Sequence, residues 1–325
     1  IGGASKKGIL VKGSNYLEAL SNSEIVVFDK TGTLTKGVFE VQKIEPVGIS
    51  KEQLIKYAAY AESYSNHPIS VSIKKAYGEE IDTNLISKTE ELSGRGVVAT
   101  IEDEDVLAGN EKLMQEKNIE YTKCNEVGTI VYIAINNEFA GYIVISDEIK
   151  EDSKKAIDDL KKNNIKQTVM LTGDRKDVGE SVAKEIGINK VYTELLPDGK
   201  VEKVEQLLKE KTEKGKLVFV GDGINDAPVL ALADIGIAMG GLGADSSIEA
   251  ADIVIMTDEP SKINTAMKIS KKTMRIVKQN IIFAIGIKIA VLILSAFGLS
   301  TMWEAVFADV GVSVIAIINS LRALK

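Results

Sequence analysis

The sequence predicts an α/β protein: a doubly wound parallel sheet, an inserted α+β domain, and a helical hairpin near its end. Three observations predict this. Short apolar runs alternate with amphipathic segments, one long stretch breaks that alternation, and two longer apolar runs stand close together near the last residues. The length of 325 residues is enough for two or three domains.

The alternation extends from Ser21 to Ile263. Short apolar strands separated by amphipathic helices are typical of a parallel sheet that is covered by helices on both faces. Strands are predicted at Ile25–Phe28, Thr168–Leu171, Val191–Thr193, Leu217–Val220, Ile235–Met239 and Ile253–Met256. Helices are predicted at Ser153–Asn163, Val178–Ile186, Lys200–Lys209 and Asp226–Ala233.

Residues 36–145 interrupt this pattern and predict an inserted cap domain with two helices and several antiparallel strands. Asn136-Asn137 separates two apolar runs, and such a pair favours a tight hairpin turn. We expect hinges where the chain enters the cap at Lys36-Gly37 and leaves it at Ser146-Asp147. The predicted helices are Lys51–Ser63 and Ile69–Tyr77, and the hairpin strands are Thr129–Ile135 and Phe139–Ile145.

The apolar runs Ile281–Phe297 and Ala305–Ile318 predict a transmembrane hairpin. Lys and Arg flank its outer ends, whereas the connection Gly298–Trp303 has neither, so both ends are expected in the cytosol. The alternative is a buried helical hairpin in a soluble domain, which leaves this charge asymmetry without a cause. The flanking cations are Lys268, Lys271, Lys272, Arg275 and Lys278 on one side, and Arg322 and Lys325 on the other.

Composition narrows the class of protein. The net charge of −7 gives no basis for a nucleic-acid partner. Cys124 is the only cysteine, which excludes an internal disulfide and a Cys-Cys metal site within this chain. The sequence starts Ile1-Gly2-Gly3-Ala4, with no initiator Met and no signal peptide, so we expect a segment of a longer polypeptide.

Asp29 follows an apolar strand, at the end where open α/β sheets place their chemistry. Such a carboxylate can act as a nucleophile and accept a phosphoryl group. Soluble phosphatases of the haloacid dehalogenase superfamily usually carry a second Asp two positions later as general acid. This chain has Thr31 there, which cannot serve as that acid, so a long-lived phosphoenzyme is expected.

Further polar residues follow the other predicted strands. Thr172-Gly173 can hydrogen-bond a phosphoryl oxygen, Lys200 at a helix start can neutralise its charge, and Asp222 with Asp226 offers carboxylates to Mg²⁺. Each motif alone could be an ordinary turn. Their order, and their positions at strand ends, favour a phosphoryl-transfer site.

Three motifs together resemble the signature set of P-type cation-transporting ATPases: Asp29-Lys30-Thr31-Gly32-Thr33-Leu34-Thr35, Thr172-Gly173-Asp174 and Gly221-Asp222-Gly223-Ile224-Asn225-Asp226-Ala227-Pro228. The resemblance implies a haloacid-dehalogenase-like fold and phosphorylation of Asp29 by ATP. It implies Mg²⁺ held by Asp29, the Thr31 carbonyl and Asp222. Thr172, Gly173 and Lys200 would bind the phosphoryl group, and Asn225 and Asp226 would support the site.

The single histidine, His67, lies between the two predicted cap helices. A lone His is usually structural. Together with Gly94-Arg95-Gly96 and Gly109-Asn110, however, His67 resembles the nucleotide-binding domain of the heavy-metal branch of this family. That resemblance implies adenine and ribose contacts from Glu62, His67, Gly94 and Gly96, with room made by close glycine approach. Gly109-Asn110 belongs to the same implied nucleotide site.

Lys288 and Asp309 stand inside the two predicted spans, where charge is costly and usually functional. Either they form a structural ion pair, or Asp309 binds a divalent cation and Lys288 neutralises it after release. Carboxylate oxygen suits Zn²⁺ better than Cu⁺. Lys288 with Asp309-Val310-Gly311 resembles the zinc/cadmium/lead-exporting subgroup.

The expected domains are a connecting segment at 1–20, a phosphorylation domain at 21–35 and 146–263, a nucleotide-binding domain at 36–145, and a linker helix with two transmembrane helices at 264–325. The expected function is ATP-driven export of Zn²⁺, Cd²⁺ or Pb²⁺ across a cell membrane, with these two domains in the cytoplasm. The expected partners are the lipid bilayer and a preceding part of the same protein, which holds the actuator domain and other membrane helices.

Two rival functions remain. A soluble haloacid-dehalogenase-type phosphatase would hydrolyse phosphate esters without transport, and Thr31, the cap and the hairpin all oppose it. A regulatory nucleotide-binding fragment without catalysis is opposed by the intact set of motifs.

Overall fold

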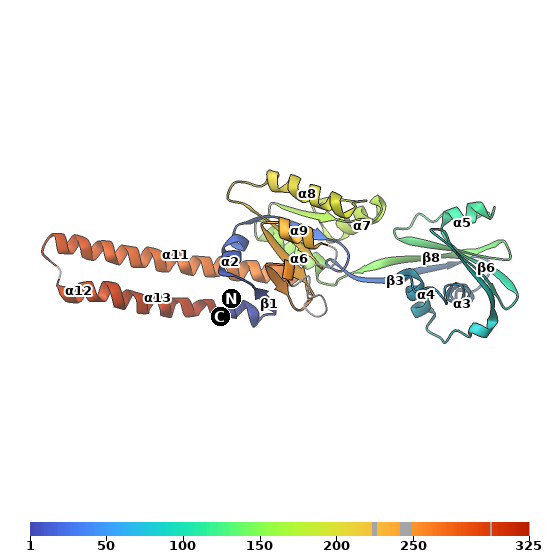
Figure 1. Ribbon diagram of the computed structural model, residues 1–325, viewed down its shortest axis with the longest axis horizontal. Coiled ribbons are helices and arrows are strands. Elements are labelled where there is room, and N and C mark those ends of the chain that lie inside the picture. Colours follow the sequence, from blue (N-terminus) through green and yellow to red (C-terminus); the bar gives the residue numbers. More distant parts are fainter. Residues whose placement is uncertain (223–225, 241–248, 300, 325) are drawn as a thin grey trace. The chain divides into compact units, whose positions relative to one another are not determined.

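The computed structural model describes residues 1–222, 226–240, 249–299 and 301–324. The chain separates into two compact units (Figure 1). The first unit comprises Ile1–Leu34 with Lys150–Lys325, and the second comprises Thr35–Ile149. The chain passes from one unit to the other at 34–35 and at 149–150, close to the hinges expected at 36–37 and 146–147. These points are the start of one long strand, Thr35–Pro46, and the end of another, Glu138–Ile149.

The first unit is built on a seven-stranded sheet, of the doubly wound kind that the sequence predicts. Its order is β1-β13-β12-β11-β2-β9-β10, and every pairing is parallel except β1 with β13. The central β2 has β11 on one side and β9 on the other, so the strand order reverses there. The strands are β1 (Ile9–Val11), β2 (Ser23–Asp29), β9 (Gln167–Leu171), β10 (Lys190–Tyr192), β11 (Lys216–Gly221), β12 (Ile235–Met239) and β13 (Ile253–Ile255).

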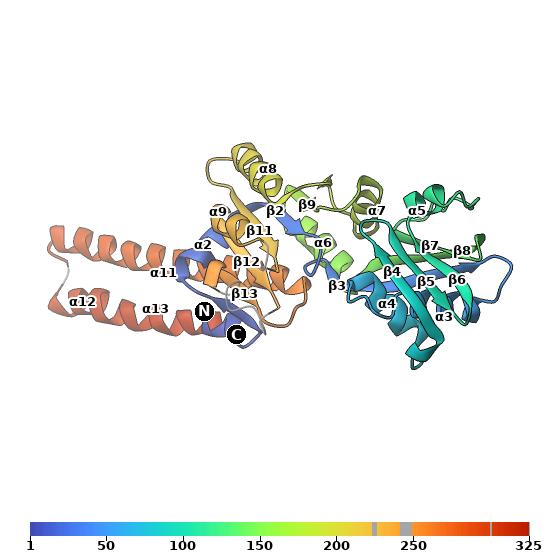
Figure 2. The same ribbon diagram turned by 45° about the vertical axis from the view of Figure 1, so that its right-hand side comes forward.

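Helices cover both faces of this sheet, because the central strands are apolar on both sides. On one face, α8 and α9 pack against Val27, Leu171 and Phe219. On the other face lie α2 and α6, and the first part of α11 contacts both (Figure 2). The bounds are α2 (Ser14–Ser21), α6 (Ser153–Lys162), α7 (Lys176–Ile186), α8 (Pro197–Glu210), α9 (Ala227–Leu232) and α11 (Ser261–Ala296).

The first residues of the chain differ from the expectation of a plain connecting segment. A short helix, α1 (Gly2–Ser5), leads into β1, which pairs antiparallel with β13 and forms one edge of the sheet. Ile9 and Val11 are buried, whereas Leu10 between them is exposed. Three residues with this alternation are too short a signal to predict a strand.

The last part of the first unit is the predicted helical hairpin. The helix α11 is continuous over 36 residues, and the chain returns along it through α12, a π-helical turn and α13 (Figure 1). By length and composition, Ser261–Ala296 and Met302–Ala323 could each cross a membrane. The returning elements are α12 (Met302–Val306), η2 (Phe307–Gly311), α13 (Val312–Ser320) and η3 (Leu321–Leu324).

The second unit is a six-stranded antiparallel sheet in the order β3-β8-β7-β6-β5-β4. Helices α3 and α4 cover one face through a cluster that includes Leu54, Ile73 and Ile143. On the other face, α5 and the segment after it pack around Tyr132. The elements are β3 (Thr35–Pro46), α3 (Lys51–Ala61), α4 (Pro68–Tyr77), η1 (Thr83–Leu85), β4 (Ile86–Leu92), β5 (Gly96–Ile101), β6 (Glu104–Gly109), α5 (Glu111–Glu116), β7 (Thr129–Ile135) and β8 (Glu138–Ile149).

Local signals explain several of these elements. Asn136 and Asn137 both have positive φ, 52° and 63°, as the predicted hairpin between β7 and β8 requires. Ser50 and Gln53 form a capping box at the start of α3, and Pro68 opens α4.

Candidate active site

Asp29 ends β2 at the point where the strand order reverses, and it is buried. The neighbouring strands are parallel to β2, so their carboxyl ends meet at the same edge of the sheet. Thr172 directly follows β9 and Asp222 directly follows β11. The sheet therefore carries the residues predicted from three separate motifs to one edge.

Lys200 connects two carboxylates of this edge. Its Nζ lies 2.6 Å from Asp29 Oδ1 and 2.9 Å from Asp226 Oδ1. Asp226 is 1% exposed, and no described residue hydrogen-bonds its Oδ2. Lys200 projects from the first turns of α8, which Pro197 opens. One ammonium group thus contacts two buried carboxylates and leaves part of their negative charge uncompensated.

The electrostatics follow from this crowding. Burial, together with repulsion from Asp226 and, to a lesser extent, Asp222, raises the pKa of Asp29 to about 7, although Lys200 opposes the shift. Burial alone would lower the pKa of Lys200, but the carboxylates of Asp29 and Asp226 raise it overall. The site has more carboxylate than ammonium charge, which suits an additional cation.

The residues predicted to hold Mg²⁺ fit that ion. Gly32 has φ 73°, and a Cβ built there would lie 3.2 Å from Asp222 Oδ2, so the loop after Asp29 packs against the Asp222 carboxylate. The candidate ligands are oxygens of Asp29, Thr31 and Asp222, the donor type that Mg²⁺ prefers. Within the described residues, no three acidic, His or Cys side chains form a metal cluster. Mg²⁺ needs none, because waters and substrate phosphates usually complete its shell.

The second motif forms a compact turn beside β9. Thr172 is buried, and its Oγ1 accepts a hydrogen bond of 3.1 Å from the amide of Asp174. Gly173 passes close to the carbonyl of Leu195, which a Cβ would approach to 3.2 Å. Asn225, predicted to support the site, lies outside the described residues.

An ion pair that the sequence did not predict joins the first two motifs. The Nζ of Lys30, whose side chain is 4% exposed, lies 2.6 Å from Asp174 Oδ2. Lys30 and Asp174 each belong to one of the predicted motifs. Nothing in the sequence shows that these two residues, far apart along the chain, form an ion pair. The only available signal was a charged residue close to each motif residue, Lys30 next to Asp29 and Asp174 two positions after Thr172.

In the second unit, the six residues predicted to bind nucleotide line one pocket of about 260 Å³. Close backbone approach shapes it: Gly96 pairs with Gly109 across β5 and β6, and a Cβ on Gly96 would lie 2.2 Å from the carbonyl oxygen of Ala108. The residues are Glu62, His67, Gly94, Gly96, Gly109 and Asn110.

Three of these side chains also have structural partners. Glu62 accepts a hydrogen bond of 2.6 Å from Ser70, and burial raises the pKa of Glu62. His67 Nδ1 accepts from the amide of Ile69 and caps α4, so the structural reading of the lone histidine has geometric support. Asn110 caps α5 and donates to the Gly94 carbonyl. Their predicted roles toward nucleotide stay predictions.

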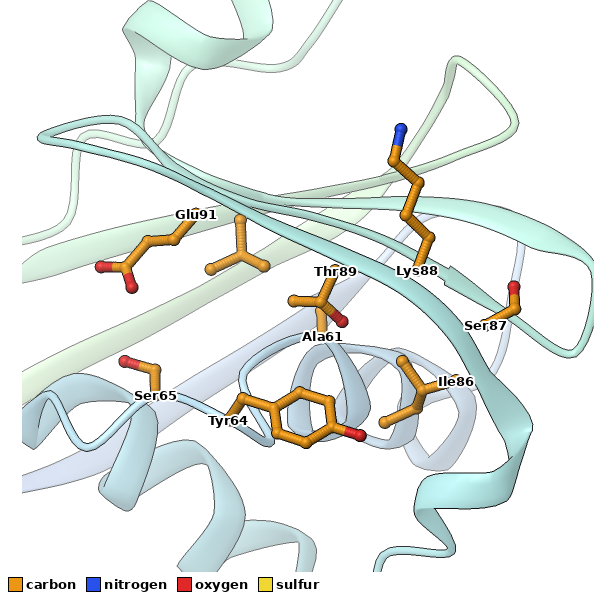
Figure 3. A pocket seen from close by; sticks show the side chains of 9 residues that line it. Ala61, Tyr64, Ser65, Ile86, Ser87, Lys88, Thr89 and Glu91 are labelled. Atoms are coloured by element: carbon orange, nitrogen blue, oxygen red, sulfur yellow. The ribbon is translucent and has the colours of Figure 1, made fainter.

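A neighbouring pocket of about 420 Å³ continues the first one beneath the edge strand β4. The two pockets share Ser65, Glu91 and Val97. Figure 3 shows the ring of Tyr64 below Thr89, with the Lys88 side chain directed away from it. No sequence pattern indicates this second pocket, because an exposed aromatic residue in a short loop, such as Tyr64, does not by itself predict a binding site.

Lys288 and Asp309 meet between the two hairpin helices, with Nζ 3.2 Å from Oδ1. Asp309 lies in the π-helical turn η2, a distortion that is frequent at functional sites. Gly311 in the same turn packs against the ring of Phe307. The ion pair agrees with both interpretations of these residues, the structural one and the one that assigns them to ion transport.

The comparisons with known proteins give the class. A family model described as a haloacid dehalogenase-like hydrolase matches residues 24–234. The chain belongs to this family.

Relatives within that class are metal-transporting ATPases. The whole chain is 56% identical to part of the cadmium, zinc and cobalt-transporting ATPase of Bacillus subtilis (strain 168), covering 46% of it. It is 51% identical to part of the zinc-transporting ATPase of Synechocystis, covering 45% of it. The chain thus spans about half the length of the curated relatives it matches.

A solved structure agrees. A zinc-transporting PIB-type ATPase in its E2.Pi state superposes with a TM-score of 0.86 at 32% identity, over 99% of this chain and 53% of that one. These similarities confirm the predicted fold class and the resemblance to heavy-metal-transporting P-type ATPases.

Proposed function

We propose that this chain is the catalytic part of an ATP-driven exporter of a divalent heavy-metal ion, and that Asp29 is its phosphorylated residue. The observation that carries this proposal is the contact of buried Asp29 with Lys200 at the reversal of strand order. Similarity to metal-transporting ATPases over the whole chain supports transport over simple phosphatase activity. The part of the relatives that this chain does not cover would correspond to the region that carries the actuator domain and the other membrane helices.

The chemistry follows from the groups at the strand ends. A carboxylate oxygen of Asp29 attacks the γ-phosphorus of ATP, the bond to the bridging oxygen breaks, and ADP leaves with the electron pair. Lys200 and the hydroxyl and amide groups of Thr172-Gly173 neutralise and orient the phosphoryl oxygens. Asp29, the Thr31 carbonyl and Asp222 would hold Mg²⁺, which when bound supplies further positive charge to those oxygens.

The lifetime of the product depends on what the site lacks. Thr31 has no carboxyl group that could give a proton to a leaving group or take one from an attacking water, so nothing at this position accelerates hydrolysis of the aspartyl phosphate. Asp226 is already engaged by Lys200. A persistent phosphoenzyme suits a cycle in which a conformational change uses the stored free energy.

Nucleotide would enter through the second unit. The pocket lined by Glu62, His67 and the glycines would hold adenine and ribose, and Gly96 and Gly109 leave space where side chains would otherwise stand. This assigns binding to one unit and phosphoryl transfer to the other.

The hairpin would span the membrane, with both soluble units in the cytoplasm. Asp309 would bind the transported Zn²⁺, Cd²⁺ or Pb²⁺, and Lys288 would pair with Asp309 after release. On this proposal, the contact between Lys288 and Asp309 would be the arrangement after release. A purely structural ion pair between the helices is the alternative.

The test uses the complete polypeptide in membranes. Labelling with γ-³²P-ATP should give acid-stable, hydroxylamine-labile label that Asp29→Asn removes. ATPase activity compared with Zn²⁺, Cd²⁺, Pb²⁺, Co²⁺ and Cu⁺ should rise with the first three. Hydrolysis of simple phosphate esters with no stable label would instead support the phosphatase alternative.

A further inference from the structure

Lys150 is the first residue after β8, where the chain returns to the first unit, and its side chain is 8% exposed. Its Nζ donates a hydrogen bond of 2.8 Å to the Gly32 carbonyl and lies 2.8 Å from Asp258 Oδ1. A buried ammonium group is costly unless it is paired and hydrogen-bonded, so both partners are needed to hold it.

The first partner belongs to the loop that follows the nucleophile. Gly32 stands three residues after Asp29, and a Cβ built on it would lie 3.2 Å from Asp222 Oδ2. Lys150 therefore holds the loop at the Gly32 carbonyl, at the residue that also lies beside the Asp222 carboxylate. A shift of the Gly32 carbonyl would move Thr31 and the position of Asp29 relative to Asp222.

The second partner belongs to the start of the long membrane-directed helix. Asp258 has a positive φ of 54° and lies just before α11, which begins at Ser261. The amide of Ser261 donates to Asp152 Oδ2 at 2.8 Å, so a second residue of the same short segment holds the first turn of α11.

The same segment contacts the nucleophile loop a second time. Ser153 Oγ donates to the Leu34 carbonyl at 2.7 Å, and the amide of Lys150 donates to that same carbonyl at 3.0 Å. Residues 150–153 thus hold the loop through Gly32 and Leu34, and the base of α11 through Asp258 and Ser261.

We propose that Lys150 is a positioning residue that couples the nucleophile loop to the base of α11, so that the state of the hairpin alters the geometry around Asp29. The inference rests on the proposed function and adds the route of coupling within the first unit. Lys150 suits the role because one ammonium group donates to a loop carbonyl and a helix-base carboxylate at once. Movement of Asp258 with α11 changes how firmly Gly32 is held.

The experiment measures phosphoenzyme formation from ATP in the complete polypeptide, with Zn²⁺ and with chelator. Lys150→Met keeps the length of the side chain and removes its charge. A small misplacement of reacting groups slows a reaction strongly. We therefore expect the Zn²⁺-stimulated rate of phosphoenzyme formation to fall roughly 10- to 100-fold, with ATP affinity retained. Lys150→Arg should recover part of the rate.

Two further variants separate coupling from simple damage. Asp258→Asn should also lower Zn²⁺ stimulation, and combined with Lys150→Met it should add little, because both remove one link. Lys155→Met, an exposed lysine of α6, is the matched control and should behave as wild type.

The outcomes are distinct. A wild type that forms no phosphoenzyme overturns the proposed function and this inference with it. A phosphorylating wild type with an unchanged Lys150→Met variant overturns the inference alone. So does a variant in which thermal stability and the rates with and without Zn²⁺ all fall in proportion, because that pattern indicates structural damage without coupling.

Discussion

The candidate phosphorylation site and the candidate nucleotide pocket of this chain depend on different kinds of contact. At the strand ends of the first unit, opposite charges from separate elements lie in contact: Asp29 and Asp226 with Lys200, and Lys30 with Asp174. In the pocket of the second unit, no such ion pair joins the described residues that line it, and the close backbone approach of Gly96 and Gly109 shapes one wall.

This difference matches the tasks proposed for them. A phosphoryl group carries charge that changes position during transfer, so preorganised charges stabilise its transition state. An adenine ring is flat and neutral, so a narrow space of the correct shape recognises it. The charged site should therefore be sensitive to loss of charge, and the pocket to gain of volume.

The largest expected effect is at the nucleophile. Asp29→Asn keeps the size of the side chain but removes the attacking carboxylate, so phosphoenzyme formation should fall by more than about 10³-fold. ATP binding should remain, since the pocket proposed for it lies in the other unit. Acid-quenched labelling from ATP and calorimetry measure the two quantities. Residual label on the variant would place the phosphorylated residue elsewhere.

Removal of the shared ammonium group should come next. Lys200→Met leaves Asp29 and Asp226 unneutralised and deprives the transferred group of a positive charge, so we expect a loss of about 10²- to 10³-fold in phosphorylation rate. Lys209→Met, on an exposed position of the same helix, is the control. Equal rates for the two variants would contradict the role given to Lys200.

ATP binding in the pocket lined by Gly96 and Gly109 should be sensitive to added side-chain volume. On Gly96 a methyl group would lie 2.2 Å from the Ala108 carbonyl, whereas around Gly48 in the same unit a Cβ finds no atom within 4 Å. Gly96→Ala should weaken ATP binding by tenfold or more, a change of at least about 1.4 kcal/mol. Gly48→Asn, at a position outside this pocket where Asn tolerates the φ of 74°, should retain binding.

Calorimetry measures both affinities, and phosphorylation by inorganic phosphate checks that the first unit is intact in each variant. If Gly96→Ala bound ATP normally, nucleotide recognition would not depend on this close approach.

The smallest effect concerns Glu62. Burial raises the pKa of Glu62, so the folded unit holds its proton more tightly than the unfolded chain does. Its stability should therefore fall as pH rises from the ordinary carboxyl range through the raised pKa. Glu62→Gln should remove that slope and change stability at neutral pH by under about 1 kcal/mol. Thermal unfolding across pH tests this, and an unchanged slope would contradict it.

The sequence predicted the site residues that stand at or immediately after the C-terminal end of a strand. A parallel sheet brings such positions together at one end of the sheet, independently of the loop conformations. Asp29, Thr172 and Asp222 are of this kind. Contacts such as Lys30 with Asp174 and Lys150 with Asp258 could not be predicted, since a lysine far along the chain gives no signal of its partner. Thr35–Pro46 was also missed as a strand, because few of its residues are buried in alternation.

The continuous helix α11 has a mechanical consequence. It contains no proline over 36 residues, so it behaves as a stiff rod of about 54 Å at 1.5 Å per residue. Lys288 stands roughly 40 Å along that rod from Ser261, and a tilt of about 5° at the base displaces it by about 3.5 Å. That displacement is comparable with the 3.2 Å between Lys288 and Asp309. The rod therefore magnifies a small rotation beside the sheet into a movement that can open or close a single contact within the hairpin.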